Sequence, residues 1–136
     1  MIYLLDTDTC IYIIKRRPAN VVKHFEDEVD IRDAGISSIT LAELRFGAEK
    51  SDLGERSLRA LNLFTASLTV HPFDAAATPT YAKIRTNLER SGTPIGPLDM
   101  LIAAHALSLN AALVTNNVRE FSRIPNLTVE NWIDEP

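Results

Sequence analysis

Short apolar runs alternate with segments of helical apolar spacing along most of the chain, and this alternation constrains the fold most strongly. Apolar runs that end at polar residues predict strands, which fall at residues 2–5, 35–38, 68–73, 112–115 and 127–132. Apolar residues three or four positions apart predict helices at 9–15, 21–29, 40–48, 58–68, 77–88 and 98–109. Residues 116–125 are predicted to form a loop. Alternating strands and helices favour an α/β protein whose parallel sheet is covered by helices on both faces.

The length of the chain and its single cysteine limit its organisation and location. Its 136 residues fit one domain, spanning 1–136. No apolar run approaches the roughly 18 residues of a membrane span. The first six residues lack the basic segment of a signal peptide, and Cys10 alone supports neither a disulfide framework nor a thiolate zinc site. We therefore expect a cytoplasmic protein without a membrane segment.

The net charge of −4 disfavours one class of nucleic-acid-binding protein. Proteins that read DNA directly usually present an excess of basic side chains to the phosphates. Clustered carboxylates, however, can hold metal cations, and the cations then meet the phosphate. The acidic composition therefore argues against a sequence-specific DNA-binding protein more than against a metal-dependent nuclease.

Three carboxylates are candidate metal ligands because apolar residues surround them in the sequence. They are Asp6, Glu43 and Asp99, and Asp8 lies close to the first of them. Burying an ionised carboxylate is costly unless it is paired or bound to a metal. Asp6 and the segment 115–117 both follow predicted strands, at the sheet edge where α/β proteins bind ligands. Hard oxygen ligands of this kind favour Mg²⁺ or Mn²⁺.

Each of these carboxylates also has a structural interpretation. Asp6 is placed to cap the helix that follows it. Glu43 follows Thr40 by three positions, which is the spacing of a capping box. Asp99 opens a helix, where a negative charge is favourable. Because a cap at the carboxyl edge of a sheet also faces the ligand crevice, the structural and functional roles are compatible.

The segment Asp6-Thr7-Asp8-Thr9 suggests a different enzyme class. It is close to the DxDxT loop of phosphatases that use an aspartate nucleophile. The loop continues with Cys10, where Thr or Val is expected. Such an enzyme also needs a later lysine, and the last lysine here is Lys83, ahead of the strand at 112–115. This phosphatase remains an alternative.

The remaining polar features are weaker signals. The three histidines share no spacing of metal ligands, and packing or surface roles are expected for His24, His71 and His105. The basic turn 15–17 is expected to be solvated, with an RNA contact as the alternative. Trp132 is expected to anchor the core.

Taken in order, six segments of the chain resemble a known family, the VapC-type PIN domains. They are LLDTD (4–8), ISSITLAEL (36–44), RFGAEKS (45–51), GPLDMLIA (96–103), VTNNVREF (114–121) and RIPNLTVENW (123–132). The resemblance covers nearly the full chain. It implies a three-layer α/β/α sandwich around a parallel sheet of about five strands.

The resemblance also implies a chemistry and a set of residues. The family consists of endoribonucleases that cleave single-stranded RNA with Mg²⁺ or Mn²⁺. Asp6, Glu43 and Asp99 fall on its acidic positions, and Asn117 falls where a fourth acid is common. The catalytic set is therefore Asp6, Glu43, Asp99 and Asn117, and the first three are the expected metal ligands. At the fourth position this chain departs from the common pattern, and Asp8 offers a compensating charge.

Substrate contacts and partners follow from the same resemblance. Thr115, Asn116 and Arg119 are expected to contact RNA, which is a transfer RNA in similar members. The family further implies a homodimer and a VapB-like antitoxin that inserts a tail into a groove, so this chain is expected to be the toxin of a toxin–antitoxin pair. A PIN fold that has lost catalysis and only binds is the other alternative, which the acids at Asp6, Glu43 and Asp99 disfavour.

Overall fold

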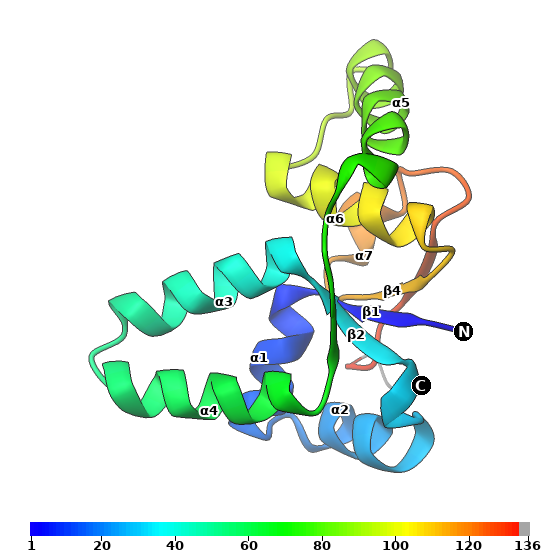
Figure 1. Cartoon of the computed structure of the whole chain (residues 1–136). Coiled ribbons are helices and arrows are strands. Elements are labelled where there is room, and N and C mark those ends of the chain that lie inside the picture. Colours follow the sequence, from blue (N-terminus) through cyan, green and yellow to red (C-terminus); the bar gives the residue numbers. More distant parts are fainter. Residues whose placement is uncertain (134–136) are drawn as a thin grey trace.

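The computed structural model describes residues 1–133. Five parallel strands form one sheet, namely β1 (Tyr3–Leu5), β2 (Ala34–Ser37), β3 (Thr69–His71), β4 (Ala112–Val114) and β5 (Thr128–Glu130). The helices are α1 (Thr7–Lys15), α2 (Ala19–Lys23), α3 (Ser38–Lys50), α4 (Gly54–Ala66), α5 (Thr78–Arg90), α6 (Pro97–Ser108) and α7 (Val118–Phe121) (Figure 1). The strand order is β3-β2-β1-β4-β5, so the chain builds the sheet outward in both directions from β1.

The sheet separates two apolar cores, which confirms the three-layer α/β/α prediction. Leu4 of β1 packs into a core with residues of α5 and α6, whereas the next residue, Leu5, packs into a core with residues of α1 to α4. Successive side chains of a strand point to opposite faces of the sheet, which explains this division. In β4, Leu113 and Val114 divide in the same way.

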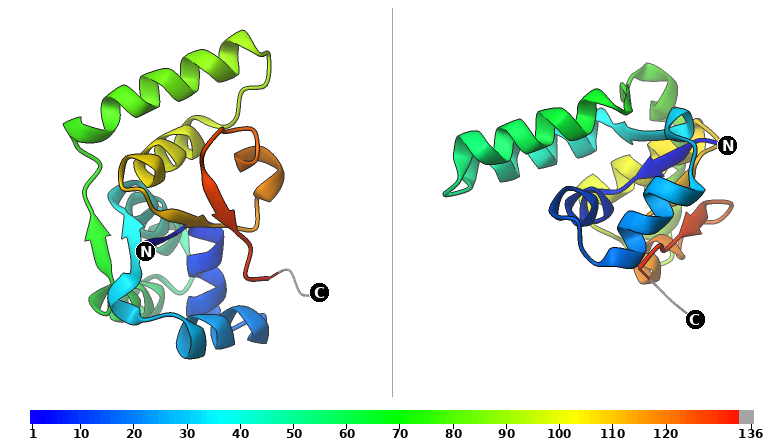
Figure 2. Two further views of the ribbon diagram at one scale, coloured as in Figure 1. Left: turned by 90° about the vertical axis from the view of Figure 1, so that its right-hand side faces the viewer. Right: turned by 90° about the horizontal axis from the view of Figure 1, so that it is seen from below.

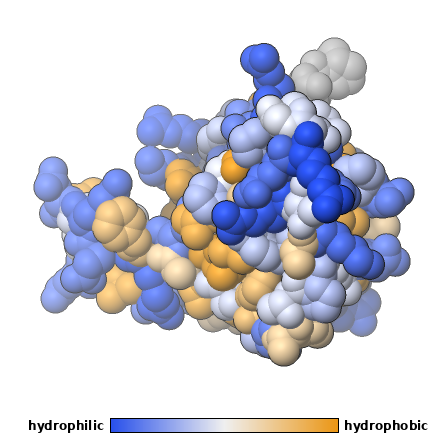
Figure 3. Space-filling view, turned by 90° about the horizontal axis from the view of Figure 1, so that it is seen from above, coloured by the Kyte–Doolittle hydropathy of each residue, from blue (hydrophilic) through white to orange (hydrophobic). Residues whose placement is uncertain are grey.

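Helices α3 and α4 form an antiparallel hairpin that projects from the sheet as an arm (Figures 1 and 2). α3 begins at Ser38 because the hydroxyl of Ser37 accepts a hydrogen bond from the amide N of Ile39, at 3.1 Å. Seen from above, the arm carries apolar side chains between hydrophilic ones (Figure 3). Phe46 and Leu63 are its most exposed large apolar residues, at 65% and 77% exposure.

Two predicted segments differ from the structure. Residues 116–125, predicted as a loop, contain α7, a helix too short to show periodic spacing. The predicted helix over 21–29 is α2 followed by a π-helical turn at His24–Glu28, and the chain becomes extended at Val29. No helix among residues 1–133 has the length and apolar character needed to cross a membrane.

Candidate active site

The first part of the site lies where β1 and β4 end side by side at the centre of the sheet. Asp6 follows β1 directly and is only 6% exposed. Its Oδ2 accepts a hydrogen bond from the hydroxyl of Thr115, at 2.8 Å, and its Oδ1 accepts one from the amide of Thr7, at 2.9 Å. The sheet grows in opposite directions from β1 and β4, so Asp6 lies at the switch point where parallel sheets bind ligands. Asp6 is therefore both the cap of α1 and a buried carboxylate at the ligand edge.

Glu43 reaches the same edge from α3. Its Oε1 accepts a hydrogen bond from the Thr7 hydroxyl, at 2.8 Å, so the first residue of α1 holds the carboxylate. The capping-box interpretation of Thr40 and Glu43 is wrong, because α3 starts two residues before Thr40 and Ser37 caps it. Glu43 therefore has no capping role in α3.

Asp99 lies in the first turn of α6, beside an acidic residue that the sequence analysis did not single out. The side chain of Glu120, a residue of α7, lies beside the carboxyl of Asp99 and helps to raise its pKa. Glu120 also accepts a hydrogen bond from the Nδ2 of Asn117, at 2.8 Å. The fourth carboxylate of the site is thus Glu120, and Asn117, predicted at this corner, positions it.

Burial and mutual repulsion raise the pKa values of these carboxyl groups. Burial, followed by the charge of Asp8, raises the pKa of Asp6 to about 6. Burial, followed by the charge of Asp6, raises the pKa of Asp99 to about 7, and Glu120 and Glu43 contribute. Burial also raises the pKa of Asp8. Among the described residues, those that shift the pKa values of Asp6, Asp8 and Asp99 include no cationic side chain. Negative charge is therefore concentrated at this edge of the sheet.

The donor set fits a hard divalent cation, because carboxylate oxygens are the ligands that Mg²⁺ and Mn²⁺ prefer and a cation would relieve the repulsion. Within residues 1–133, however, no three His, Cys, Asp or Glu side chains are already arranged as a metal-binding group. Mg²⁺ is usually held by one or two carboxylates and keeps several waters, so two of these side chains are enough to bind it.

Two other residues singled out in the sequence, Asp8 and Thr115, form hydrogen bonds with the backbone around the site. Asp8 accepts hydrogen bonds from the backbone amides of Asn116, at 3.1 Å, and Thr9, at 2.6 Å, and so ties α1 to the end of β4. The Thr115 hydroxyl, besides holding Asp6, accepts the amide of Asn117 at 3.0 Å. Arg119 is exposed on α7, directly before Glu120.

The histidines and the basic turn do not join the carboxylates. His105 is buried beside Ser37, and His24 stacks on Trp132 with ring centroids 4.4 Å apart, as the expected packing roles require. His71 meets the ring of His105 edge-on. In the turn 15–17, Arg16 forms an ion pair with Glu26 at 3.0 Å.

Comparison with known proteins identifies the family. Residues 3–127 match the PIN domain. Ribonuclease VapC2 of Rickettsia felis is 46% identical to this chain over 97% of it and 98% of the relative, and the tRNA(fMet)-specific endonuclease VapC of Shigella flexneri is 44% identical over 96% and 97%. Among solved structures, VapBC2 of Rickettsia felis bound to a DNA fragment from the promoter aligns with a TM-score of 0.91 at 44% identity, over 97% of this chain and 99% of that one. FitAcB of Neisseria gonorrhoeae aligns with a TM-score of 0.80 at 28% identity, over 98% and 100%. The chain belongs to the PIN domain family, among its VapC members.

Proposed function

We propose that this protein is a metal-dependent endoribonuclease and the toxin of a toxin–antitoxin pair. One observation carries the proposal: Asp6 and Asp99 are far apart in the sequence but close in the fold, and the charge of Asp6 helps to raise the pKa of the half-buried Asp99 to about 7. Perturbed carboxyl pKa values of this kind are common at catalytic and metal sites. The relatives named ribonuclease or tRNA-specific endonuclease, at 44–46% identity, support the same reaction.

The proposed cofactor is Mg²⁺ or Mn²⁺. Asp6 and Asp99 would hold the ion, with Glu43 and Glu120 completing the acidic surroundings. When bound, such an ion activates a water molecule and stabilises the charge that develops on the phosphate. Thr115 fixes the orientation of Asp6 through its 2.8 Å hydrogen bond. Residues that orient a ligating carboxylate in this way commonly tune a metal site.

Three further residues would act on the water and the substrate. Glu43, held by the hydroxyl of Thr7, would orient the attacking water or take its proton. Arg119 is exposed on α7 beside Glu120 and would contact a phosphate of the RNA strand. Asn116 contributes its backbone amide to Asp8, so its part in RNA binding would be to shape the loop after β4.

The antitoxin is proposed to bind the groove between α1, α3 and α4. This groove has a volume of about 400 Å³ and is lined mainly by apolar residues, namely Ile11, Ile14, Leu44, Gly47, Ala48, Leu53, Ala60 and Leu61. Glu43 lines one side of the groove, so an occupying segment would lie against the catalytic carboxylates. Lys15 and Arg56 also line it and suit an acidic partner. The VapBC structures that resemble this chain support such a complex, and a homodimer is proposed with it.

The phosphatase alternative finds no support in the geometry. A phosphatase of this class needs a lysine beside its aspartates, and no lysine is among the groups that shift the pKa values of Asp6 and Asp8. The last lysine, Lys83, lies on α5.

A cleavage assay tests the proposal and separates it from an inactive binding module. Purified protein is incubated with single-stranded RNA in Mn²⁺, in Mg²⁺ and in EDTA. We expect cleavage with either ion and none in EDTA, with products that carry 5′-phosphate and 3′-hydroxyl ends. Cleavage that persists in EDTA would exclude metal catalysis, and binding without cleavage under every condition would favour the inactive module.

A further inference from the structure

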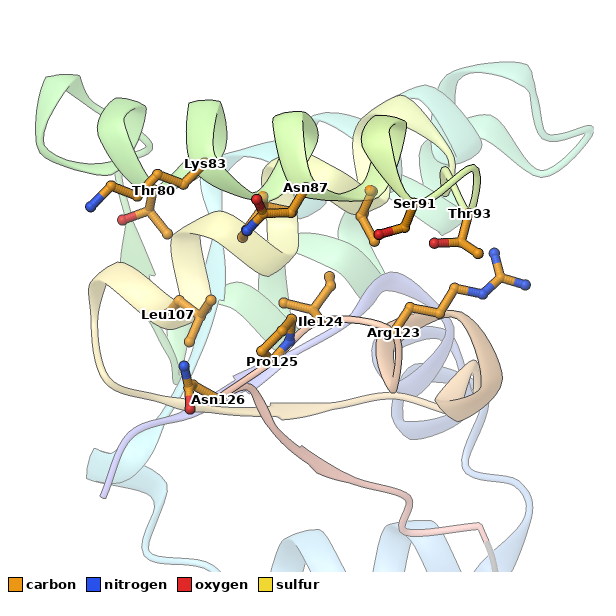
Figure 4. Close-up of a pocket in the computed structure, with 12 residues that line it drawn as sticks. Thr80, Lys83, Asn87, Ser91, Thr93, Leu107, Arg123, Ile124, Pro125 and Asn126 are labelled. Carbon is orange, nitrogen blue, oxygen red and sulfur yellow. The ribbon is translucent and has the colours of Figure 1, made fainter.

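A second groove runs between α5 and residues 123–126, on the α5–α6 side of the sheet (Figure 4). Its volume is about 280 Å³. Ile84, Leu88 and Ile124 form its base and are almost fully buried. Leu107 and Pro125 also line it, and the remaining side chains are polar and surround the opening, namely Thr80, Lys83, Asn87, Ser91, Thr93, Arg123 and Asn126. Among the described residues that line this groove there are two cations and no carboxylate.

One end of this groove adjoins the carboxylate site. The backbone amide of Arg123 donates to the carbonyl of Glu120, at 3.1 Å, so Arg123 lies one turn beyond the fourth carboxylate. The guanidinium of Arg123 donates to the carbonyl of Pro94, also at 3.1 Å. Pro94 lies just before α6, whose first turn carries Asp99. Lys83 lies further along the groove, on α5 (Figure 4).

The charge of the groove is the reverse of that of the whole protein. The chain carries a net charge of −4, and its catalytic edge is acidic. RNA that reaches this edge must be attracted by groups elsewhere on the surface, since carboxylates repel phosphate until a metal is bound. Arg123 provides positive charge near the site and Lys83 provides it at the other end of the groove (Figure 4), and the amides and hydroxyls between them can donate hydrogen bonds to phosphate oxygens.

From these observations we propose that the groove binds the sugar–phosphate backbone of the RNA strand as it leaves the carboxylate site. This inference rests on the proposed ribonuclease function and adds a second subsite to it. A protein partner fits less well, because Ile84, Leu88 and Ile124 are 7%, 4% and 3% exposed and only Leu107 and Pro125 offer further apolar surface. These two residues are outnumbered by the polar side chains that a sugar–phosphate backbone would meet.

Two substrates separate this subsite from the catalytic centre. A dinucleotide has only the scissile phosphodiester and leaves no phosphate for the groove, whereas a single strand of about 30 nucleotides reaches both the carboxylate site and the groove. The double variant Lys83→Gln/Arg123→Gln is compared with Lys23→Gln/Arg59→Gln, which removes the same charge from α2 and α4. For each protein, kcat/KM is measured with Mn²⁺ on both substrates.

We expect the ratio of kcat/KM for the long RNA to that for the dinucleotide to fall about tenfold in the groove variant, mainly through KM. The control variant is expected to keep the wild-type ratio. Lys83→Glu leaves Arg123 and its contact with Pro94 intact and should lower the ratio as well. An unchanged ratio in all groove variants would overturn the inference. Failure of the wild-type protein to cleave either substrate would instead overturn the proposed function.

Salt dependence and molecular mass provide independent readouts. Each lost phosphate contact should reduce the slope of log affinity against log salt by about 0.7 for single-stranded RNA. The groove variant should therefore bind the long RNA with a shallower slope than its control. If the groove variant changes the oligomeric state in light scattering while its RNA affinity and slope stay unchanged, the groove is an interface between copies of the chain, and the RNA subsite is wrong.

Discussion

Two polar clusters lie near the carboxyl edge of the same sheet, and they differ in how their groups are satisfied. In the first, Nδ1 of the buried His105 lies 2.8 Å from the hydroxyl of Ser37, which also accepts the amide of Ile39. His105 packs edge-on against Phe73 with ring centroids 5.4 Å apart, and burial lowers its pKa, which favours the neutral imidazole. Its neighbour His71 fits because Gly35 has no Cβ, since one would lie 2.7 Å from Nε2 of His71.

The second cluster holds carboxylates instead of neutral groups. Asp6 and Asp99 are pushed towards their protonated forms by burial and by negative neighbours. Neutral groups that satisfy one another stabilise a fold, whereas like charges held together weaken it. The Ser37–His105 cluster fixes the start of α3, and the carboxylate cluster at the same edge keeps the charge that attracts a cation. The comparison assigns stability to the first cluster and function to the second.

The largest effect is expected from Asp99→Asn. Loss of a metal ligand should reduce RNA cleavage by about a thousandfold or more. Stability of the metal-free protein at pH 7 should stay equal or rise, because one of the repelling charges is gone. Cleavage rates and urea unfolding in EDTA measure the two effects, and Asp6→Asn should behave alike. A variant that loses stability together with activity would contradict this division of roles.

A smaller loss of activity is expected from Glu43→Gln. The amide can still accept the hydrogen bond from Thr7 but cannot take a proton or support a cation, so cleavage should fall about a hundredfold or more. Helix content by circular dichroism should be unchanged, since Ser37 and not Glu43 caps α3. Full activity in this variant would leave Glu43 with a structural role only.

Ser37→Ala should show the opposite pattern. It removes the N-cap of α3 and the partner of a buried imidazole nitrogen, so the unfolding free energy should fall by about 2–3 kcal/mol. The protein that remains folded should keep its affinity for Mn²⁺. Ser37→Thr, which retains the hydroxyl, is the matched control and should recover part of the stability. If Ser37→Ala abolished Mn²⁺ binding in folded protein, the two clusters would not be separable.

The pH dependence of stability gives the smallest effect. The folded-state pKa values of about 6 for Asp6 and about 7 for Asp99 exceed the ordinary value of 3.8, so the folded protein binds more protons than the unfolded chain between these limits. Protonation of Asp6 and Asp99 therefore stabilises the folded state at acidic pH, and this contribution is lost as the pH rises through 6 to 7. With allowance for the partial exposure of Asp99, metal-free stability should fall by about 2 kcal/mol from pH 4.5 to pH 8 relative to the Asp6→Asn/Asp99→Asn protein. Equal pH profiles for the two proteins would contradict the repulsion.

The sequence alone predicted the three carboxylates and the five strands that lie around the candidate site. Asp6, Glu43 and Asp99 stand out because each charge interrupts an apolar segment. The positions of the five strands were also predicted, because an alternating α/β pattern determines where strands fall. These assignments rest on local patterns that tertiary contacts did not change.

Glu120 was missed for the opposite reason. It lies on a helix of four residues, which cannot display the 3.6-residue period, and its contacts with Asp99 and Asn117 depend on how the chain returns after β4. A predicted helix at 118–121 would have drawn attention to Glu120, which lies three residues after Asn117. The two grooves were equally hidden, since each combines side chains from segments distant in the sequence.

Calorimetric titration with Mn²⁺ at pH 7 tests the central claim most directly, namely that the carboxylate cluster is held under repulsion in order to bind a catalytic cation. The wild-type protein, Asp99→Asn and Ser37→Ala are titrated without RNA, at a temperature where all three are folded. The account predicts a binding isotherm for the wild type that Ser37→Ala retains and Asp99→Asn loses. Mn²⁺ binding that survives in Asp99→Asn, or that is absent from the wild type, would contradict it.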